Sequence, residues 1–188
     1  MRTLAITQNI TLDGSIEMIG DWFDPQAGSG QDDGADQLTE LRRQDETADA
    51  LLLGRQTFED FRGYWPLQTD DPTGITAYLD QVQKYVVSST LTDPGWEPTT
   101  VLDGNWLAAV RELKEQPGQD IVVTGSITLT HALIAAGLVD EYRLFTYPAV
   151  QGRGRRLFPD GVEVPRLRRL DAKSFGNGVT YAAYAPVR

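Results

Sequence analysis

Three short segments combine glycine, hydroxyl and arginine side chains in a way that suits the binding of phosphate groups. They are Gly54-Arg55-Gln56-Thr57, Ser88-Ser89-Thr90 and Gly125-Ser126-Ile127. Glycine lets a ligand approach the backbone closely, hydroxyls donate hydrogen bonds, and the guanidinium of Arg55 matches a phosphate group. Helices that begin at Arg55 and Ser126 would add free N–H groups and a positive dipole end. Together the three segments predict a site for a ligand with several phosphates.

Each segment follows a short apolar run that is typical of a strand buried on both faces. The runs are residues 50–53, 85–87 and 121–123. Such strands predict a parallel sheet covered by helices, in which ligands bind beyond the carboxyl ends of the strands. For each cluster a purely structural role stays open, because glycine, serine and threonine also form caps and turns.

Apolar periodicity predicts the other elements. A helix starts at Ala35 with Leu38 and Leu41 on its inward side, and another passes through Leu129 and ends at Gly137. Residues 14–34 and 63–74 lack a clear period and are expected to be loops. Further predictions are strands over 3–10 and 142–147, helices over 55–61 and 104–115 with Asp103 or Asn105 as N-cap, and a hairpin over 167–174 and 178–185.

Composition excludes several classes of function. The 188 residues include no cysteine and one histidine, which excludes disulfides, thiolate metal sites and histidine-rich metal sites. A net charge of −10 argues against nucleic-acid binding. No apolar run reaches the ~20 residues of a membrane span, and the first residues do not resemble a secretory signal. We therefore expect a soluble, cytoplasmic protein with a small-molecule partner and no metal.

The ordered set of motifs is more specific than any one of them. Its members are residues 11–14 (TLDG), 52–58 (LLGRQTF), 87–91 (VSSTL), 123–126 (VTGS) and the run from Gly137 through Pro148 to Phe158. This set resembles the dihydrofolate reductase fold, and more closely the bacterial dihydrofolate reductase family related to the reductase domain of riboflavin-biosynthesis deaminase/reductases. The resemblance implies a single domain over residues 1–188 with a three-layer α/β fold. Its mixed, mostly parallel sheet is flanked by helices and ends in an antiparallel hairpin.

The resemblance also implies NADPH as the cofactor. In such proteins the Gly-Arg-x-Thr segment and the Ser-Ser turn hold the adenosine 2′-phosphate and the pyrophosphate, which here assigns Gly54, Arg55, Thr57, Ser88 and Ser89, with Thr90 nearby. The Gly-Ser segment holds the pyrophosphate from the other side, which assigns Gly125, Ser126 and Ile127, with Leu129 nearby. Because an arginine beside hydroxyls suits a phosphomonoester, we predict a preference for NADPH over NADH.

On the substrate side, the resemblance implies hydride transfer to a small pterin- or aminopyrimidine-like heterocycle. The reduced group also needs a proton, which a positioned acid or water supplies. Dihydrofolate reductases use a carboxylate on the helix after the first loop, and the candidates here are Asp36 and, second, Asp33. Asp13 is a candidate for substrate binding or for a turn, and Trp22 for the pocket wall or for covering the core.

The resemblance leaves the substrate less defined than the cofactor. Riboflavin-pathway reductases carry a lysine in the first strand, where this chain has Thr7 and Gln8. Relatives are commonly homodimers, so we expect a homodimer. Two alternatives stay open: a non-catalytic NADP-binding or regulatory protein of the same fold, and an unrelated α/β binding module whose strand-end glycines are structural.

Overall fold

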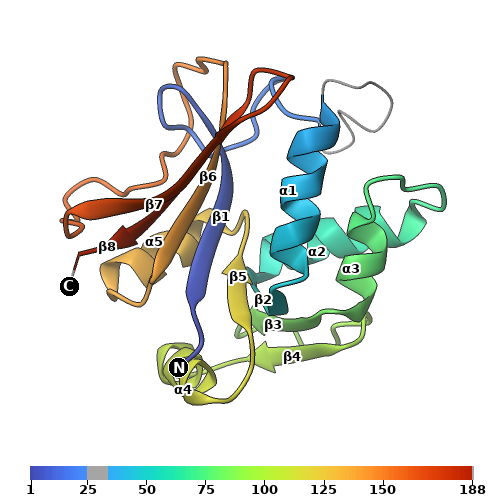
Figure 1. Cartoon of the computed structure of the whole chain (residues 1–188). Helices are drawn as coiled ribbons and strands as arrows, with labels where there is room; N and C mark the ends of the chain where they lie inside the picture. Colours follow the sequence, from blue (N-terminus) through green and yellow to red (C-terminus); the bar gives the residue numbers. More distant parts are fainter. Residues whose placement is uncertain (25–33, 188) are drawn as a thin grey trace.

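The computed structural model describes residues 1–24 and 34–187, and an eight-stranded sheet is its central layer (Figure 1). The strand order is β4-β3-β2-β5-β1-β6-β8-β7, and β1 to β6 run parallel, while β8 is antiparallel to both β6 and β7. The strands are β1 (Leu4–Thr11), β2 (Ala48–Gly54), β3 (Gln83–Val87), β4 (Thr99–Leu102), β5 (Asp120–Val123), β6 (Glu141–Tyr147), β7 (Leu167–Ser174) and β8 (Thr180–Pro186).

Helices cover both faces of the sheet, which confirms the predicted three-layer α/β fold with its C-terminal antiparallel hairpin. Helices α4 and α5 pack on one face, and α1, α2 and α3 lie over the other. Their bounds are α1 (Ala35–Asp45), α2 (Arg55–Tyr64), α3 (Ile75–Gln81), α4 (Trp106–Glu115) and α5 (Ile127–Ala135), and a 3-10 turn (Trp65–Leu67) follows α2. In the described residues no helix is both long and apolar enough to cross a membrane.

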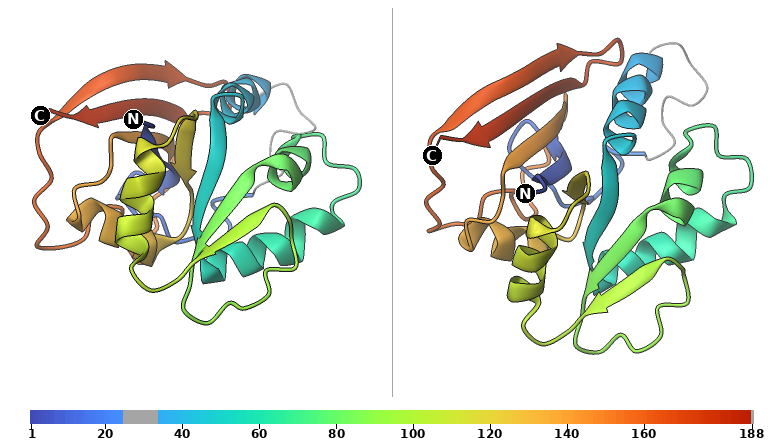
Figure 2. Two further views of the ribbon diagram at one scale, coloured as in Figure 1. Left: turned by 90° about the horizontal axis from the view of Figure 1, so that it is seen from below. Right: turned by 60° about the horizontal axis from the view of Figure 1, so that its bottom comes forward.

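Alternation along the strands divides the apolar side chains between the two faces. Leu52 joins the core beneath α4 and α5, whereas its neighbours Leu51 and Leu53 join a core beneath α2 and α3. A third core, around Phe145 and Tyr181, lies beneath α1. Figure 2 shows α1 beside the β7–β8 hairpin, while α2 and α3 lie over the opposite part of the sheet. One face of the sheet therefore carries two separate apolar cores.

Between these two cores, the middle of the sheet is left partly open. Thr7 and Asn9 of β1 and Val122 of β5 are only half-buried, although they lie in the central strands. All three line a cavity of about 990 Å³. The separation of the two cores thus creates the space in which a ligand can lie against the sheet.

Helix α1 buries a polar side, whereas the sequence predicts that Leu38 and Leu41 form its inward side. The buried residues of α1 are Gln37, Glu40 and Gln44. Leu38 and Leu41 are half-buried and line the cavity, and Leu41 also packs against the third core. This polar side is tolerated because Glu40 and Gln37 have partners on the helix and in the hairpin.

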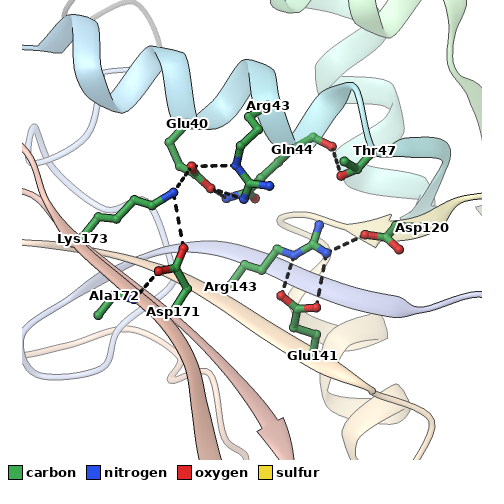
Figure 3. A network of polar contacts seen from close by, with 10 residues as sticks. All are labelled: Glu40, Arg43, Gln44, Thr47, Asp120, Glu141, Arg143, Asp171, Ala172 and Lys173. Atoms are coloured by element: carbon green, nitrogen blue, oxygen red, sulfur yellow. Dashed lines mark hydrogen bonds and ion pairs between the residues drawn. The ribbon is translucent and has the colours of Figure 1, made fainter.

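An ionic cluster ties α1 to the hairpin (Figure 3). The carboxylate of Glu40, 4% exposed, accepts hydrogen bonds from Arg43 at 2.7 Å and from Lys173 of β7 at 2.6 Å. Gln44 donates a further hydrogen bond to it at 2.8 Å. Burial alone would raise the pKa of Glu40, but these hydrogen bonds outweigh it and lower the pKa to about 2. Glu40 is therefore charged throughout the neutral range and holds α1 on the sheet.

Two short elements were not predicted from the sequence. Helix α3 (Ile75–Gln81) and strand β4 (Thr99–Leu102) lie in stretches with little apolar periodicity. The predicted loop over residues 63–74 is also partly wrong, because it contains the end of α2 and the 3-10 turn. Trp65, 5% exposed, anchors that turn in the core beneath α2 and α3. Long-range packing stabilises these elements, and a local pattern does not record it.

Replacing Glu40 tests the importance of the ionic cluster. We expect Glu40→Gln to lower the free energy of unfolding at pH 7 by about 2 kcal/mol, because two cations lose a buried partner. Because the folded pKa lies near 2 and the ordinary value is 4.5, the difference from wild type should shrink as the pH falls from 4.5 towards 2. Urea unfolding at pH 7 and pH 3 measures both effects.

Glu112→Gln serves as the control for this change, since Glu112 is an exposed residue of α4. It should alter stability by less than about 0.5 kcal/mol at either pH. Equal stability of the Glu40 and Glu112 variants at pH 7 would show that the cluster does not hold α1.

Candidate functional site

The ends of β3, β2 and β5 lie side by side, as predicted, because β2 pairs with both of the other strands. The segments after β2 and β5 are in direct contact through Ser126. Its Oγ accepts a hydrogen bond from the Gly54 N–H at 2.9 Å, and its own N–H donates to Thr57 Oγ1 at 2.9 Å. Ser126 has a positive φ of 47°, a conformation that is costly for a residue with a side chain. The two hydrogen bonds hold it there.

Gly125 is required by the same close packing. It has a φ of 57°, and a Cβ on it would lie 3.1 Å from Thr57 Cγ2. Its carbonyl oxygen accepts hydrogen bonds from Gln8 at 2.7 Å and from the Thr130 hydroxyl at 3.2 Å. The turn after β5 is thus fixed by contacts from β1, α2 and α5.

These contacts correct one part of the phosphate-site prediction. The N–H groups of Gly54 and Ser126 are occupied by side chains of the protein and do not face a ligand. The first N–H groups of α2 and α5 still have no partner within their own helices, and neither N-cap side chain bonds to them. Both helix starts line the cavity, including Arg55 and Ile127. Any anion would therefore meet the next residues of each helix.

Arg55 lies at the cavity and is already ion-paired. Its guanidinium contacts Glu59 at 2.8 Å, one turn further along α2, and its side chain is 46% exposed. An exposed pair of this type contributes little stability, so an incoming phosphate can replace the carboxylate at small cost. The arrangement leaves Arg55 available to a ligand.

The Ser88-Ser89-Thr90 segment forms a tight turn beyond β3. Ser88 Oγ accepts hydrogen bonds from the N–H groups of Thr90 at 3.1 Å and Leu91 at 3.0 Å. Ser89 and Thr90 are exposed, and the cavity reaches this strand at Val87, directly before the turn. The segment therefore sits at the margin of the site, on the exposed side.

The structure places Asp36 away from the cavity. Its carboxylate accepts hydrogen bonds from the N–H groups of Gln37 at 2.8 Å and of Gly176, in the hairpin turn, at 3.0 Å. Gln37, not Asp36, lines the cavity. Asp36 therefore acts as a link between α1 and the hairpin, and its catalytic role stays a prediction. Asp33 lies outside the described residues.

Asp13 and Trp22 take part in the loops beside the site. Asp13 accepts hydrogen bonds from Thr11 at 2.6 Å and from the N–H groups of Gln151 and Gly152, and these lower its pKa to about 2. This matches the turn role weighed for it. Trp22 donates to Gln151 Oε1 at 2.7 Å and packs edge-on against Tyr147, which lines the cavity. Trp22 thus supports the wall from behind.

Sequence reasoning missed a carboxylate that does line the cavity. Asp45, at the end of α1, is half-buried, and burial raises its pKa to about 7. Tyr78 of α3 lines the same part of the cavity, and burial, with a smaller effect of the Asp45 charge, raises the pKa of its hydroxyl. The spacing along the helix could have revealed it. Asp45 follows Leu38 by seven residues and Leu41 by four, which places all three on the same side of a helix. These three side chains share one face of α1.

Comparisons with known proteins agree with this geometry. The RibD C-terminal domain family matches residues 2–181, and the chain belongs to this family. It is similar to the uncharacterized protein YyaP of Bacillus subtilis, with 32% identity over 97% of this chain and 94% of that protein.

Solved structures share the fold. A pyrimidine reductase-like protein from Corynebacterium diphtheriae has a TM-score of 0.66 and 18% identity, with 100% of this chain and 92% of that chain covered. Dihydrofolate reductase from Enterococcus faecalis, complexed with NADP(H), has a TM-score of 0.63 and 16% identity, with 97% and 95% covered. The predicted dihydrofolate reductase-like fold is therefore confirmed.

The raised pKa of Asp45 can be tested through stability. Between its ordinary pKa of 3.8 and about 7, the native state binds more protons than the unfolded chain, so this residue makes stability fall as the pH rises. We expect Asp45→Asn to raise the free energy of unfolding at pH 8 by on the order of 1 kcal/mol, after allowance for partial solvent exposure, and to have no such effect at pH 4. Urea unfolding at both pH values measures this difference.

Glu46→Gln, at the exposed neighbouring position, is the matched control and should change stability little at either pH. An Asp45→Asn effect of equal size at pH 4 and pH 8 would contradict the raised pKa.

Proposed function

We propose that this protein is an NADPH-dependent reductase that transfers a hydride to a flat heterocyclic substrate, pterin- or aminopyrimidine-like. Family membership and the dihydrofolate reductase-like fold support a reductase, and they set aside the alternative of an unrelated binding module. A structural relative with this fold is described as a complex with NADP(H). The particular cofactor and substrate class are our proposal.

One observation carries the proposal most directly. The starts of α2 and α5, where an anion can bind, and the open middle of the sheet line the same cavity. A dinucleotide could thus place its phosphates at the helix starts and its ring against the sheet, next to a substrate. A volume of about 990 Å³ lies at the upper end of the range for small-molecule sites.

The residues at the strand ends fit such a cofactor. Arg55 lines the cavity at the start of α2 and offers an exposed guanidinium to a phosphomonoester. When bound, NADPH would supply the hydride. The proton that accompanies it is proposed to come from water, since Asp36 bonds to the hairpin turn and does not line the cavity.

Cofactor binding and turnover can be measured separately. NADPH at 1,000 times its dissociation constant should stabilise the protein by roughly 4 kcal/mol, read as a thermal shift. Loss of absorbance at 340 nm should follow when dihydrofolate, a quinoid pterin or the riboflavin-pathway aminopyrimidine is added. A shift without any loss of absorbance would favour the non-catalytic NADP-binding protein, and the absence of a shift would contradict the proposal.

Replacing Arg55 tests the choice between the two cofactors. We expect Arg55→Ala to weaken NADPH binding about tenfold, because a charge-assisted contact to the 2′-phosphate is lost, and to change NADH binding less than about twofold. Titration calorimetry with each cofactor measures the two constants. Equal losses for NADPH and NADH would refute the role of Arg55.

Glu59→Gln is the matched variant for this test. It removes the carboxylate that pairs with Arg55, so NADPH should bind at least as tightly as in the wild type. Weaker NADPH binding in this variant would show that the ion pair itself positions Arg55.

A further inference from the structure

Tyr147 is a cavity-lining side chain to which the proposed function gives no role. It is the last residue of β6, is half-buried, and lines the cavity together with Gln37 of α1. The rings of Trp22 and Phe23 meet its ring edge to face, with centroid distances of 5.4 Å and 5.7 Å. These contacts fix the ring and, with it, the position of the phenol oxygen.

A chain of hydrogen bonds decides how the Tyr147 hydroxyl is used. The backbone N–H of Val179 can only donate, so Asn177 Oδ1 accepts from it at 3.1 Å and Asn177 Nδ2 faces Gln37. Asn177 Nδ2 donates to Gln37 Oε1 at 2.6 Å, and this leaves Gln37 Nε2 to donate to Tyr147 Oη at 3.0 Å. Because the Tyr147 oxygen accepts this hydrogen bond, its own hydrogen must turn away from Gln37.

The hydroxyl hydrogen of Tyr147 has no acceptor among the described residues. Burial raises the pKa of Tyr147, and the hydrogen bond from Gln37 offsets only part of this rise, so the hydroxyl stays protonated at neutral pH. A partly buried donor without an acceptor is unfavourable, and an acceptor atom on a ligand would relieve this. The cavity therefore presents an oriented, uncharged hydrogen-bond donor.

Two further tyrosines line the cavity, and their hydroxyls are not oriented in this way. Tyr64 is 39% exposed, and Tyr78 is half-buried. Within the described part of the chain, neither hydroxyl forms a hydrogen bond that would fix its direction. Only the hydroxyl of Tyr147, among these three, is turned by a partner whose own orientation is set by backbone contacts.

A fixed donor of this kind suits the reduction of a C=N or C=O bond. When a hydride from the proposed nicotinamide cofactor adds to the carbon atom, the electron pair of the double bond moves to the nitrogen or oxygen atom. An O–H group aimed at that atom stabilises the negative charge as it develops, and water then supplies the proton. The donor must already point at the atom, since turning it during the reaction would cost energy.

We propose that the Tyr147 hydroxyl donates a hydrogen bond to the nitrogen or oxygen atom of the substrate bond that is reduced, and that Gln37 is the positioning residue that keeps the hydroxyl turned towards it. This inference rests on the proposed function and adds a substrate-binding group to the same site.

Two flat compounds that differ only at one carbon atom test the donor without NADPH: 9-fluorenone, which has a carbonyl group, and fluorene, which has a CH2 group in its place. We expect Tyr147→Phe to weaken 9-fluorenone about fivefold, because one neutral hydrogen bond is lost, and to leave fluorene within twofold. Equilibrium dialysis measures both affinities. Infrared spectroscopy should show a lower carbonyl stretching frequency for 9-fluorenone bound to the wild type than for 9-fluorenone bound to Tyr147→Phe.

Tyr64→Phe is the matched control, because it removes another hydroxyl from the lining of the same cavity. It should change neither affinity more than twofold and should leave the carbonyl frequency unchanged. Urea unfolding confirms that each variant is folded. Equal 9-fluorenone affinity in the wild type and Tyr147→Phe, including no binding to either, would overturn the proposal.

Gln37→Glu tests the direction of the hydroxyl separately from its presence. The new carboxylate has the same shape and still accepts from Asn177, but it can only accept, so it should take the Tyr147 hydrogen for itself. We expect this variant to lose 9-fluorenone affinity and the carbonyl shift as Tyr147→Phe does, although its tyrosine is intact. Wild-type values in Gln37→Glu would show that Gln37 does not position the hydroxyl.

The two proposals fail in different ways. If NADPH does not stabilise the protein but 9-fluorenone responds to Tyr147→Phe as expected, the reductase function falls and the donor stands. If NADPH binds and the variants do not change 9-fluorenone binding, the inference about Tyr147 falls alone.

Discussion

The contact between Ser126 and the end of β2 is the interaction on which the rest of the site depends. Ser126 adopts a left-handed backbone conformation, and it is held there by its hydrogen bonds with Gly54 and Thr57. The same contact joins the turn after β5 to the first turn of α2. Both helix starts are thereby aimed into one cavity. The N-terminal dipoles of α2 and α5 thus act on the same cavity, where they favour a negatively charged group.

The cavity exists because one face of the sheet is covered by two independent groups of helices. Helices α2 and α3 pack on an apolar core over β2 and β3, whereas α1 is fixed to the hairpin by the polar contacts of Glu40 and Gln37. Between the two groups, Thr7 and Asn9 of β1 and Val122 of β5 are left half-buried. Because α1 uses ion pairs and amides where most helices use apolar packing, its apolar side chain Leu38 lines the cavity, and Leu41 lines it while also packing on the third core.

The sequence predicts features that depend on residues close together in the chain better than features that depend on residues far apart. The three strand ends and α5 follow from local patterns, since Gly54 ends a buried apolar run, and Gly125 and Gly137, both with a positive φ, mark turns that few other residues can form. The buried polar side of α1 does not, because one of the partners of Glu40 is Lys173, far away in the chain. The place of Asp45 in the cavity depends on the same docking of α1. Asp36 has the expected position on that helix, yet its oxygens bond to a hairpin that no local pattern brings there.

Gln151 joins two loops at the margin of the site through a single side chain. Its Oε1 accepts from the Ile19 amide and the Trp22 indole, and its Nε2 lies within hydrogen-bonding distance of Ser15 Oγ and the carbonyl oxygens of Glu17 and Arg153. An amide can supply acceptors on one side and donors on the other, whereas a carboxylate of the same shape can only accept. This side chain thus links the two loops from both of its ends, and isosteric acidification at this position would remove the donor end of the link.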